Sequence, residues 1–157
     1  MDLNLPCFDY RLSHDADGVT RIFDCLRGRF VALTPEEWVR QHFVNFLITE
    51  RSYPRGLMAN EVSLKLNRTS RRCDTLVYSR SGRPLAVIEY KAPTVAITQK
   101  VFDQIARYNS VVGSRYLIVS NGLTHYCCSF DEISRSYRFM RDIPRYDALS
   151  EEICQTD

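Results

Sequence analysis

The spacing of apolar residues along the chain predicts two amphipathic helices. In residues 35–51, apolar side chains recur every three or four positions, which places them on one face of a helix. Thr34 suits an N-cap and Glu37 stands at the reciprocal capping-box position, so a helix is expected to begin there. A second stretch, 98–112, shows the same spacing and ends before Gly113. The two stripes consist of Val39, Phe43, Phe46 and Leu47, and of Val101, Ile105, Tyr108 and Val112.

Shorter apolar runs bounded by turn residues predict strands between and after these helices. We expect strands at 57–66, 71–78, 85–91, 115–120, 124–130 and 136–140. The first three are joined by short turns and should be antiparallel. The strands on either side of the second helix should be parallel, because a helical crossover joins them. The pattern therefore predicts an α/β protein with a mixed sheet and helices packed on it.

The length of 157 residues is sufficient for one domain with a sizeable core. We expect a single domain over residues 1–157, with its core at about 34–130. Residues 1–33 are predicted to form a β-hairpin lead-in that covers an edge of the sheet. Residues 131–157 are predicted to be a C-terminal extension, polar and either helical or frayed at its end.

Composition narrows the class of protein. Apolar residues make up 45% and charged residues 25%, as in ordinary globular proteins, and the net charge of +2 does not indicate a nucleic-acid binder. Any basic surface must therefore be local, and the arginines around one hairpin could face a phosphate backbone or could simply be solvated. They are Arg68, Arg71, Arg72, Arg80 and Arg83.

Cysteine usage and the lack of long apolar stretches indicate where the protein works. The six cysteines form no Cys-x-x-Cys pair and only three histidines are present, which argues against a zinc site. Free cysteines at predicted strand positions are typical of a reducing compartment, so we expect a cytoplasmic protein. The N-terminus lacks a signal peptide's apolar segment, and no stretch is long enough to span a bilayer, so no membrane association is expected.

Three charged residues on two adjacent strands predict a site that binds a metal ion. Glu89 and Lys91 share one face at the end of a strand that is otherwise apolar, and Asp74 on the partner strand can lie beside Glu89. Buried charges are costly unless they are paired or hold a metal ion. Two carboxylates suit Mg²⁺, and a lysine beside them could hold or deprotonate an attacking water. The alternative is a structural salt bridge between Lys91 and Asp74 or Glu89.

Two further pairs of residues are candidates for the same site. Glu36 is expected on the apolar stripe of the first helix, which capping does not explain, and Glu37 is the fallback; both could merely favour the helix dipole. Gln104 and Tyr108 lie four residues apart and should face the same way. They could reach a bound nucleic acid or hold the site lysine, or they could be a surface amide and a core phenol.

Four motifs in this order resemble the N-terminal nuclease-type domain of type I restriction enzyme R subunits, within the PD-(D/E)XK nuclease superfamily. The motifs cover about residues 34–130. They are Thr34-Pro35-Glu36-Glu37-Trp38-Val39-Arg40-Gln41, Arg72-Cys73-Asp74, Glu89-Tyr90-Lys91-Ala92-Pro93 and Phe102-Asp103-Gln104-Ile105-Ala106-Arg107-Tyr108-Asn109.

The resemblance implies a restriction-endonuclease-like αβββαβ core and Mg²⁺-dependent cleavage of DNA, with Mn²⁺ as a substitute. Asp74, Glu89 and the backbone carbonyl of Tyr90 would be metal ligands, and Lys91 would position the water. Glu36 would match the superfamily's helical acid, although its register against Glu37 is not fixed. By the same resemblance, Gln104 and Tyr108 match a Gln-x-x-x-Tyr motif that assists catalysis or DNA contact.

The sequence departs from the R-subunit pattern in two ways. Cys73 precedes the aspartate where many members have proline, and the 157 residues contain no Gly-x-x-x-x-Gly-Lys-Ser/Thr loop for ATP. The missing motor leaves three contexts open: a stand-alone nuclease, a fragment, or a subunit with which a helicase, translocase or specificity subunit acts in trans. We expect an endonuclease domain; the alternatives are a catalytically idle nucleic-acid-binding or subunit-docking module with the same fold, and a small α/β domain whose acidic cluster is only a salt bridge.

Overall fold

A six-stranded mixed sheet forms the centre of the computed structural model, which describes residues 2–66 and 69–151. The strand order is β4-β5-β6-β7-β8-β9, and every neighbouring pair is antiparallel except β6 and β7, which are parallel. The bounds are β4 Met58–Leu66, β5 Thr69–Tyr78, β6 Pro84–Tyr90, β7 Tyr116–Ser120, β8 His125–Asp131 and β9 Ser136–Met140. The predicted α/β class and mixed sheet are confirmed.

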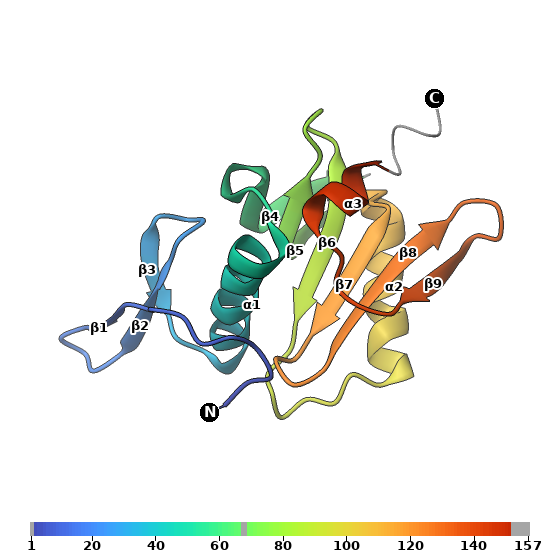
Figure 1. The fold of residues 1–157 in the computed structure, drawn as a ribbon. Helices are drawn as coiled ribbons and strands as arrows, with labels where there is room; N and C mark the ends of the chain where they lie inside the picture. Colours follow the sequence, from blue (N-terminus) through green and yellow to red (C-terminus); the bar gives the residue numbers. More distant parts are fainter. Residues whose placement is uncertain (1, 67–68, 152–157) are drawn as a thin grey trace.

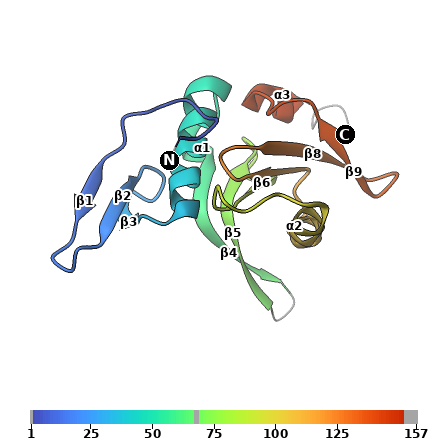
Figure 2. The same cartoon turned by 90° about the horizontal axis from the view of Figure 1, so that it is seen from below.

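Two helices cover opposite faces of this sheet, as Figures 1 and 2 show. Helix α1 spans Pro35–Arg51 and α2 spans Gln99–Val112, within one residue of the predicted starts and ends. Both begin at a threonine N-cap: Thr34 Oγ1 accepts a hydrogen bond of 3.1 Å from the N–H of Glu37, and Thr98 Oγ1 accepts one from Val101. The caps are local features, so the sequence predicts them well.

The hydrophobic core has two halves, one on each face of the sheet. Ile88 and Tyr90 pack toward α1, whereas Val87, which precedes Ile88 and points to the opposite face, packs toward α2. The α2 half also receives Phe102 and Ile105, which are 6% and 4% exposed. Strand β6 is therefore buried on both sides, as the continuous apolar run predicted.

The C-terminal segment completes the α1 half of the core. After β9, residues 141–145, which include the buried Ile143, lead into helix α3, Tyr146–Glu151. Tyr146 is fully buried and its hydroxyl donates a hydrogen bond of 2.9 Å to the carbonyl oxygen of Tyr78. Residues of the predicted extension thus contribute a strand and core side chains, and the end of the extension, 152–157, lies outside the described residues.

The N-terminal segment forms a separate three-stranded sheet, β1 Leu12–His14, β2 Thr20–Asp24 and β3 Arg29–Ala32. Figure 1 shows it beside α1, and its strands do not extend the main sheet; the turn after β2 reaches the edge strand β4, where Asp24 accepts a hydrogen bond from Asn60, so the predicted cover of an edge is confirmed only at this turn. It contacts the rest of the molecule through the turn after β2, where Asp24 is fully buried and Arg27 pairs with Glu37 of α1. This contact between the turn and α1 is made by polar side chains, and the periodicity of apolar residues does not reveal it.

The described residues contain free thiols and no candidate membrane helix. Five cysteines in the described part of the chain are free: Cys7, Cys25, Cys73, Cys127 and Cys128. Cys154 lies outside it. Within the same residues, no helix is both long and apolar enough to cross a membrane. A short 3-10 helix, η1 Arg55–Leu57, joins α1 to β4.

Candidate functional site

Asp74 of β5 and Glu89 of β6 lie side by side on the sheet. The register pairs Thr75 with Ile88 and Leu76 with Val87, which places Asp74 opposite Glu89. The two carboxyl groups are within hydrogen-bond reach of one another, and burial together with the negative charge of Asp74 raises the pKa of Glu89 to about 9. Two carboxyl groups this close keep a proton unless a cation joins them. The predicted neighbourhood of the two acids is confirmed.

Lys91 stands at the same end of β6. Its backbone N–H donates a hydrogen bond of 2.9 Å to the carbonyl oxygen of Ser120, which extends the parallel ladder beyond Tyr90. The positive charge of Lys91 opposes the rise in the pKa of Glu89, as does that of Arg40. The structure therefore brings Asp74, Glu89 and Lys91 into one neighbourhood.

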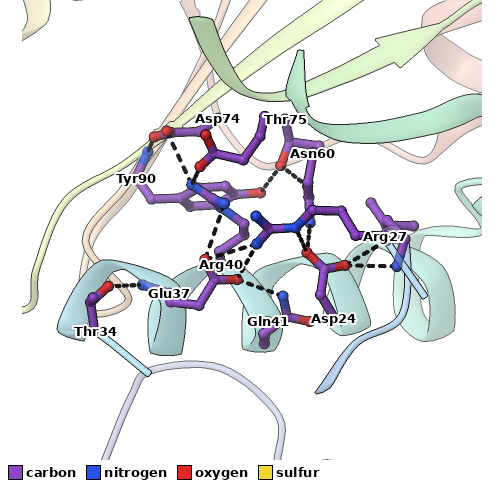
Figure 3. A network of polar contacts seen from close by, with 12 residues as sticks. Asp24, Arg27, Thr34, Glu37, Arg40, Gln41, Asn60, Asp74, Thr75 and Tyr90 are labelled. Carbon is purple, nitrogen blue, oxygen red and sulfur yellow. Dashed lines mark hydrogen bonds and ion pairs between the residues drawn. The ribbon is translucent and has the colours of Figure 1, made fainter. Parts of the chain in front are cut away.

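Asp74 is fixed by two neighbours that come from different elements. Its Oδ2 accepts a hydrogen bond of 2.8 Å from the backbone N–H of Tyr90, and its Oδ1 accepts one of 3.1 Å from Arg40 Nη2. The Asp74 side chain is 27% exposed, so its carboxylate keeps access to solvent. Both contacts are drawn in Figure 3.

Tyr90 separates the site from the core. Its ring is buried on the α1 face, and its hydroxyl lies 3.1 Å from Thr75 Oγ1, which in turn donates to Asn60 at 2.6 Å. Burial raises the pKa of Tyr90 beyond its ordinary range. The Tyr90 side chain therefore belongs to the interior, and only its backbone carbonyl remains a predicted metal ligand.

The structure corrects the placement of the helical acid. Glu36 is exposed, so it does not lie on the buried stripe of α1 as the spacing suggested. Glu37 is 7% exposed and its carboxylate contacts Arg27, Arg40 and Gln41 at 2.7 to 3.1 Å. One residue on a helix is a rotation of about 100°, which decides whether a first-turn side chain faces the sheet or the solvent. Glu37, the fallback, is the acid joined to the site, through Arg40.

Two charged residues of the site were not singled out from the sequence. Arg40 of α1 has a side chain that is 5% exposed and contacts Glu37, Glu61 and Asp74. Glu61 of β4 lies between the register pairs Asn60–Thr75 and Val62–Cys73, and hence opposite Asp74. The available signal was the interruption of the alternating apolar pattern of this strand by Asn60 and Glu61.

A buried polar network joins the site to the N-terminal sheet (Figure 3). Asp24 accepts hydrogen bonds from the backbone N–H groups of Leu26 and Arg27 at 2.8 and 3.0 Å. Its Oδ2 also accepts one of 2.8 Å from Asn60 Nδ2, and Asn60 binds Thr75. These hydrogen bonds lower the pKa of Asp24 although burial opposes them. The network holds the turn after β2 against β4 and β5.

The remaining candidates are dispersed. Gln104 is exposed on α2, and the side chain of Tyr108 lies outside the described part of the chain. The proposed arginine cluster is divided: Arg72 contacts Glu61 at 2.6 Å near the site, whereas Arg80 contacts Asp147 at 3.6 Å. Arg72 lies on β5 before Asp74, whereas Arg80 lies in the turn after β5. An extended strand rises about 3.3 Å per residue, so the two arginines are too far apart along it to belong to one surface patch. Arg68 and the side chain of Arg71 are not described.

The donor set at this site fits a hard divalent cation. In the described residues, no group of three or more histidine, cysteine, aspartate or glutamate side chains is arranged to hold a metal ion. The pair of Asp74 and Glu89 offers carboxylate oxygens, and Mg²⁺ is commonly bound by one or two carboxylates with retained waters. A backbone carbonyl can complete such a set, which is the role predicted for Tyr90.

The fold and the family can now be stated. A mixed sheet with an αβββαβ core, flanked by helices and carrying the acid pair on its second and third strands, is a restriction-endonuclease-like fold. Residues 35–144 match the family described as the type I restriction enzyme R protein N terminus, and the chain belongs to that family.

A solved structure supports the same fold. It is a fragment described as an HsdR subunit of a type I restriction enzyme from Vibrio vulnificus YJ016, with 19% sequence identity and a TM-score of 0.57. The similarity covers 78% of this chain and 26% of that chain, so this chain spans about a quarter of its length. No match was found among curated proteins.

Proposed function

We propose that this domain is a divalent-metal-dependent DNA endonuclease domain of the type I restriction R-subunit family. The observation that carries the proposal is the contact between the Asp74 and Glu89 carboxyl groups, with Lys91 at the same strand end. Lys91 and Arg40 are the cations beside the two acids, but Arg40 is shared with Glu37 and Glu61, so salt bridges leave the repulsion between the two acids only partly compensated. A cation between the two acids would remove this conflict.

Asp74, Glu89 and the carbonyl of Tyr90 would hold a Mg²⁺ ion, or Mn²⁺ in its place. When bound, the ion supplies charge stabilisation at a phosphate and lowers the pKa of a bound water. The Tyr90 N–H fixes Asp74 Oδ2, so that one ligand is oriented before any ion arrives. Glu89, whose pKa is raised, would have to be deprotonated to serve as a ligand of the ion.

Lys91 would orient the attacking water or take its proton. It follows Glu89 by two residues on an extended strand, so the ammonium and the carboxylate lie on one face. Arg72, whose side chain is 69% exposed beside Glu61, would contact a DNA phosphate and hold the backbone in place. Such a contact gives position and affinity without reading sequence.

The partners we propose follow from the family. R subunits belong to type I restriction enzymes, so we infer that this domain works on DNA together with a helicase or translocase and a specificity subunit. The 157 residues contain no phosphate-binding loop for ATP, so the motor activity that we propose as a partner is not part of these residues.

The test is plasmid cleavage in Mg²⁺ and in Mn²⁺. Wild-type protein should nick or linearise the plasmid, and Lys91→Ala should reduce the rate by about 100-fold or more. Lys100→Ala is the matched control, since Lys100 is exposed at the start of α2. Circular dichroism should show both variants folded.

The other outcomes separate the competing functions. Binding of DNA without cleavage in either metal would favour the catalytically idle binding or docking module. Binding of neither DNA nor metal would leave only the structural salt bridge.

A further inference from the structure

Arg40 is a buried cation shared among three acids. Its Nη1 contacts Glu37 at 3.1 Å, while one nitrogen, Nη2, contacts both Glu61 Oε1 at 2.7 Å and Asp74 Oδ1 at 3.1 Å. The shorter of the two Nη2 contacts is to Glu61. Asp74 therefore compensates only part of the Arg40 charge, and Glu61 and Glu37 compensate the rest (Figure 3 shows Arg40 between α1 and Asp74).

This arrangement has two local costs. Glu61 has a φ of 57°, which is the left-handed region that residues other than glycine rarely adopt, and it does so within strand β4. Arg40 Nε is buried and has no hydrogen-bond partner among the described residues. Strained backbone and unsatisfied buried donors persist where surrounding structure enforces them, commonly at functional sites.

The guanidinium and a divalent ion would compete for Asp74. A positive charge within hydrogen-bond distance of a ligand carboxylate repels an incoming cation and weakens its binding. Glu61 and Glu37 offset that charge, and Glu61 does so on the nitrogen that touches Asp74. The negative charge of Glu61 thus reduces the repulsion that the Arg40 charge exerts on a cation at Asp74.

We propose that Arg40 and Glu61 are positioning residues of the metal pocket: Arg40 orients Asp74, and Glu61 neutralises Arg40 so that Asp74 stays available to a divalent ion. The proposal rests on the proposed function, because it assumes that an ion binds between Asp74 and Glu89. Neither residue touches the ion or the DNA in this account. Both act through the orientation and charge of Asp74.

Mn²⁺ binding measured by calorimetry and by electron paramagnetic resonance tests the proposal. Glu61→Gln should weaken Mn²⁺ binding about tenfold or more, since one nearby compensating charge is lost. Glu50→Gln removes one negative charge from the exposed end of α1 and should change the dissociation constant less than about twofold. Glu61→Asp keeps the charge and should stay within about threefold of wild type.

A second variant separates positioning from simple structural support. Glu61→Gly removes the charge while glycine adopts a φ of 57° without strain and Arg40 keeps Glu37 and Asp74 as partners, so the variant should fold and melt no lower than Glu61→Gln. Its Mn²⁺ affinity should nevertheless fall as far as that of Glu61→Gln. A purely structural role would instead move melting temperature and metal affinity together.

The outcomes are distinguishable from failure of the proposed function. If wild-type protein binds Mn²⁺ and both Glu61→Gln and Glu61→Gly bind it equally well, the positioning role is overturned and the metal pocket stands. If wild-type protein binds no Mn²⁺, the metal pocket itself is wrong, and the positioning role is overturned with it.

Discussion

Asp74 Oδ2 accepts a hydrogen bond of 2.8 Å from the backbone N–H of Tyr90, so a carboxylate on one strand is fixed by the backbone of the next. This bond uses a backbone donor that lies between Glu89 and Lys91 in sequence. It therefore couples the position of Asp74 to that of the Glu-x-Lys segment without any side chain between them. A site assembled in this way is held by the register of two paired strands, which is more rigid than a loop.

The pH dependence of stability should reveal the raised pKa of Glu89, which burial and the nearby Asp74 charge together produce. The pKa of Glu89 rises from 4.5 to about 9 on folding, so between these values the folded state holds a proton that the unfolded state releases. The contribution of Glu89 to stability is thus present below about pH 4.5 and is lost as the pH rises toward 9. Glu89→Gln cannot ionise and should lose this dependence.

Urea unfolding at pH 5, 7 and 9 in the presence of a chelator measures this effect. Relative to wild type, Glu89→Gln should become progressively more stable from the lowest to the highest pH. Parallel pH profiles for the two proteins would show that folding does not raise the pKa of Glu89. The same variant should lose Mn²⁺ binding.

Substitution of the two glutamates in the first turn of α1 should have unequal effects. Glu37→Ala leaves Arg27 and Arg40 without a shared carboxylate, and removing one member of a buried ion pair costs about 3–5 kcal/mol of unfolding free energy. Glu36→Ala, at an exposed position, should change that free energy by less than about 0.5 kcal/mol.

Urea denaturation gives both values, and a plasmid assay on folded Glu36→Ala tests the role first predicted for Glu36. We expect that variant to cleave at the wild-type rate. A large loss of cleavage without loss of stability would instead place Glu36 at the scissile phosphate.

The Tyr90 hydroxyl should matter for stability and not for metal binding. Tyr90→Phe removes a buried hydrogen bond to Thr75, but Thr75 Oγ1 keeps its 2.6 Å bond to Asn60, so the expected cost is about 1 kcal/mol. Mn²⁺ affinity should be unchanged, because only the Tyr90 backbone is a proposed ligand. Calorimetric titration together with thermal melting checks both parts, and weaker Mn²⁺ binding by the phenylalanine variant would contradict the assignment.

Gly122 should be intolerant of any side chain. It has a φ of 82°, and a Cβ atom there would lie 2.7 Å from Leu3 Cδ2 and 3.1 Å from Val39 Cγ2. The left-handed conformation alone costs alanine about 1–2 kcal/mol, and the contacts add to this. Gly56→Ala is the control, since no atom lies within 4 Å of its added Cβ. Thermal unfolding should show a clear loss for Gly122→Ala only; equal melting temperatures would show that Leu3 does not pack there.

The elements set by neighbouring residues could be predicted from the sequence. Thr34 and Thr98 begin the two helices because a threonine cap acts within one turn. The hairpin of β5 and β6 fixes its own register through a short turn, which is why Asp74 was expected beside Glu89. These features depend on few residues that lie close together along the chain.

The parts that were missed depend on residues far apart in the sequence. Arg40 pairs with acids from α1, β4 and β5, and no local sequence pattern predicts that these three acids meet. The N-terminal sheet lies beside α1 because Asp24 and Arg27 fit polar groups on β4 and α1, while Cys25 and Leu26 of the same turn pack against the core. Glu36 was preferred to Glu37 because helical spacing places a stripe only to within about one residue.

Anomalous scattering from a crystal of the protein soaked in Mn²⁺ tests the central claim most directly. The account predicts a single strong peak with Asp74 and Glu89 carboxylate oxygens and the Tyr90 carbonyl oxygen within about 2.0–2.4 Å of it. A peak elsewhere on the molecule, or none at a Mn²⁺ concentration that supports plasmid cleavage, would contradict it.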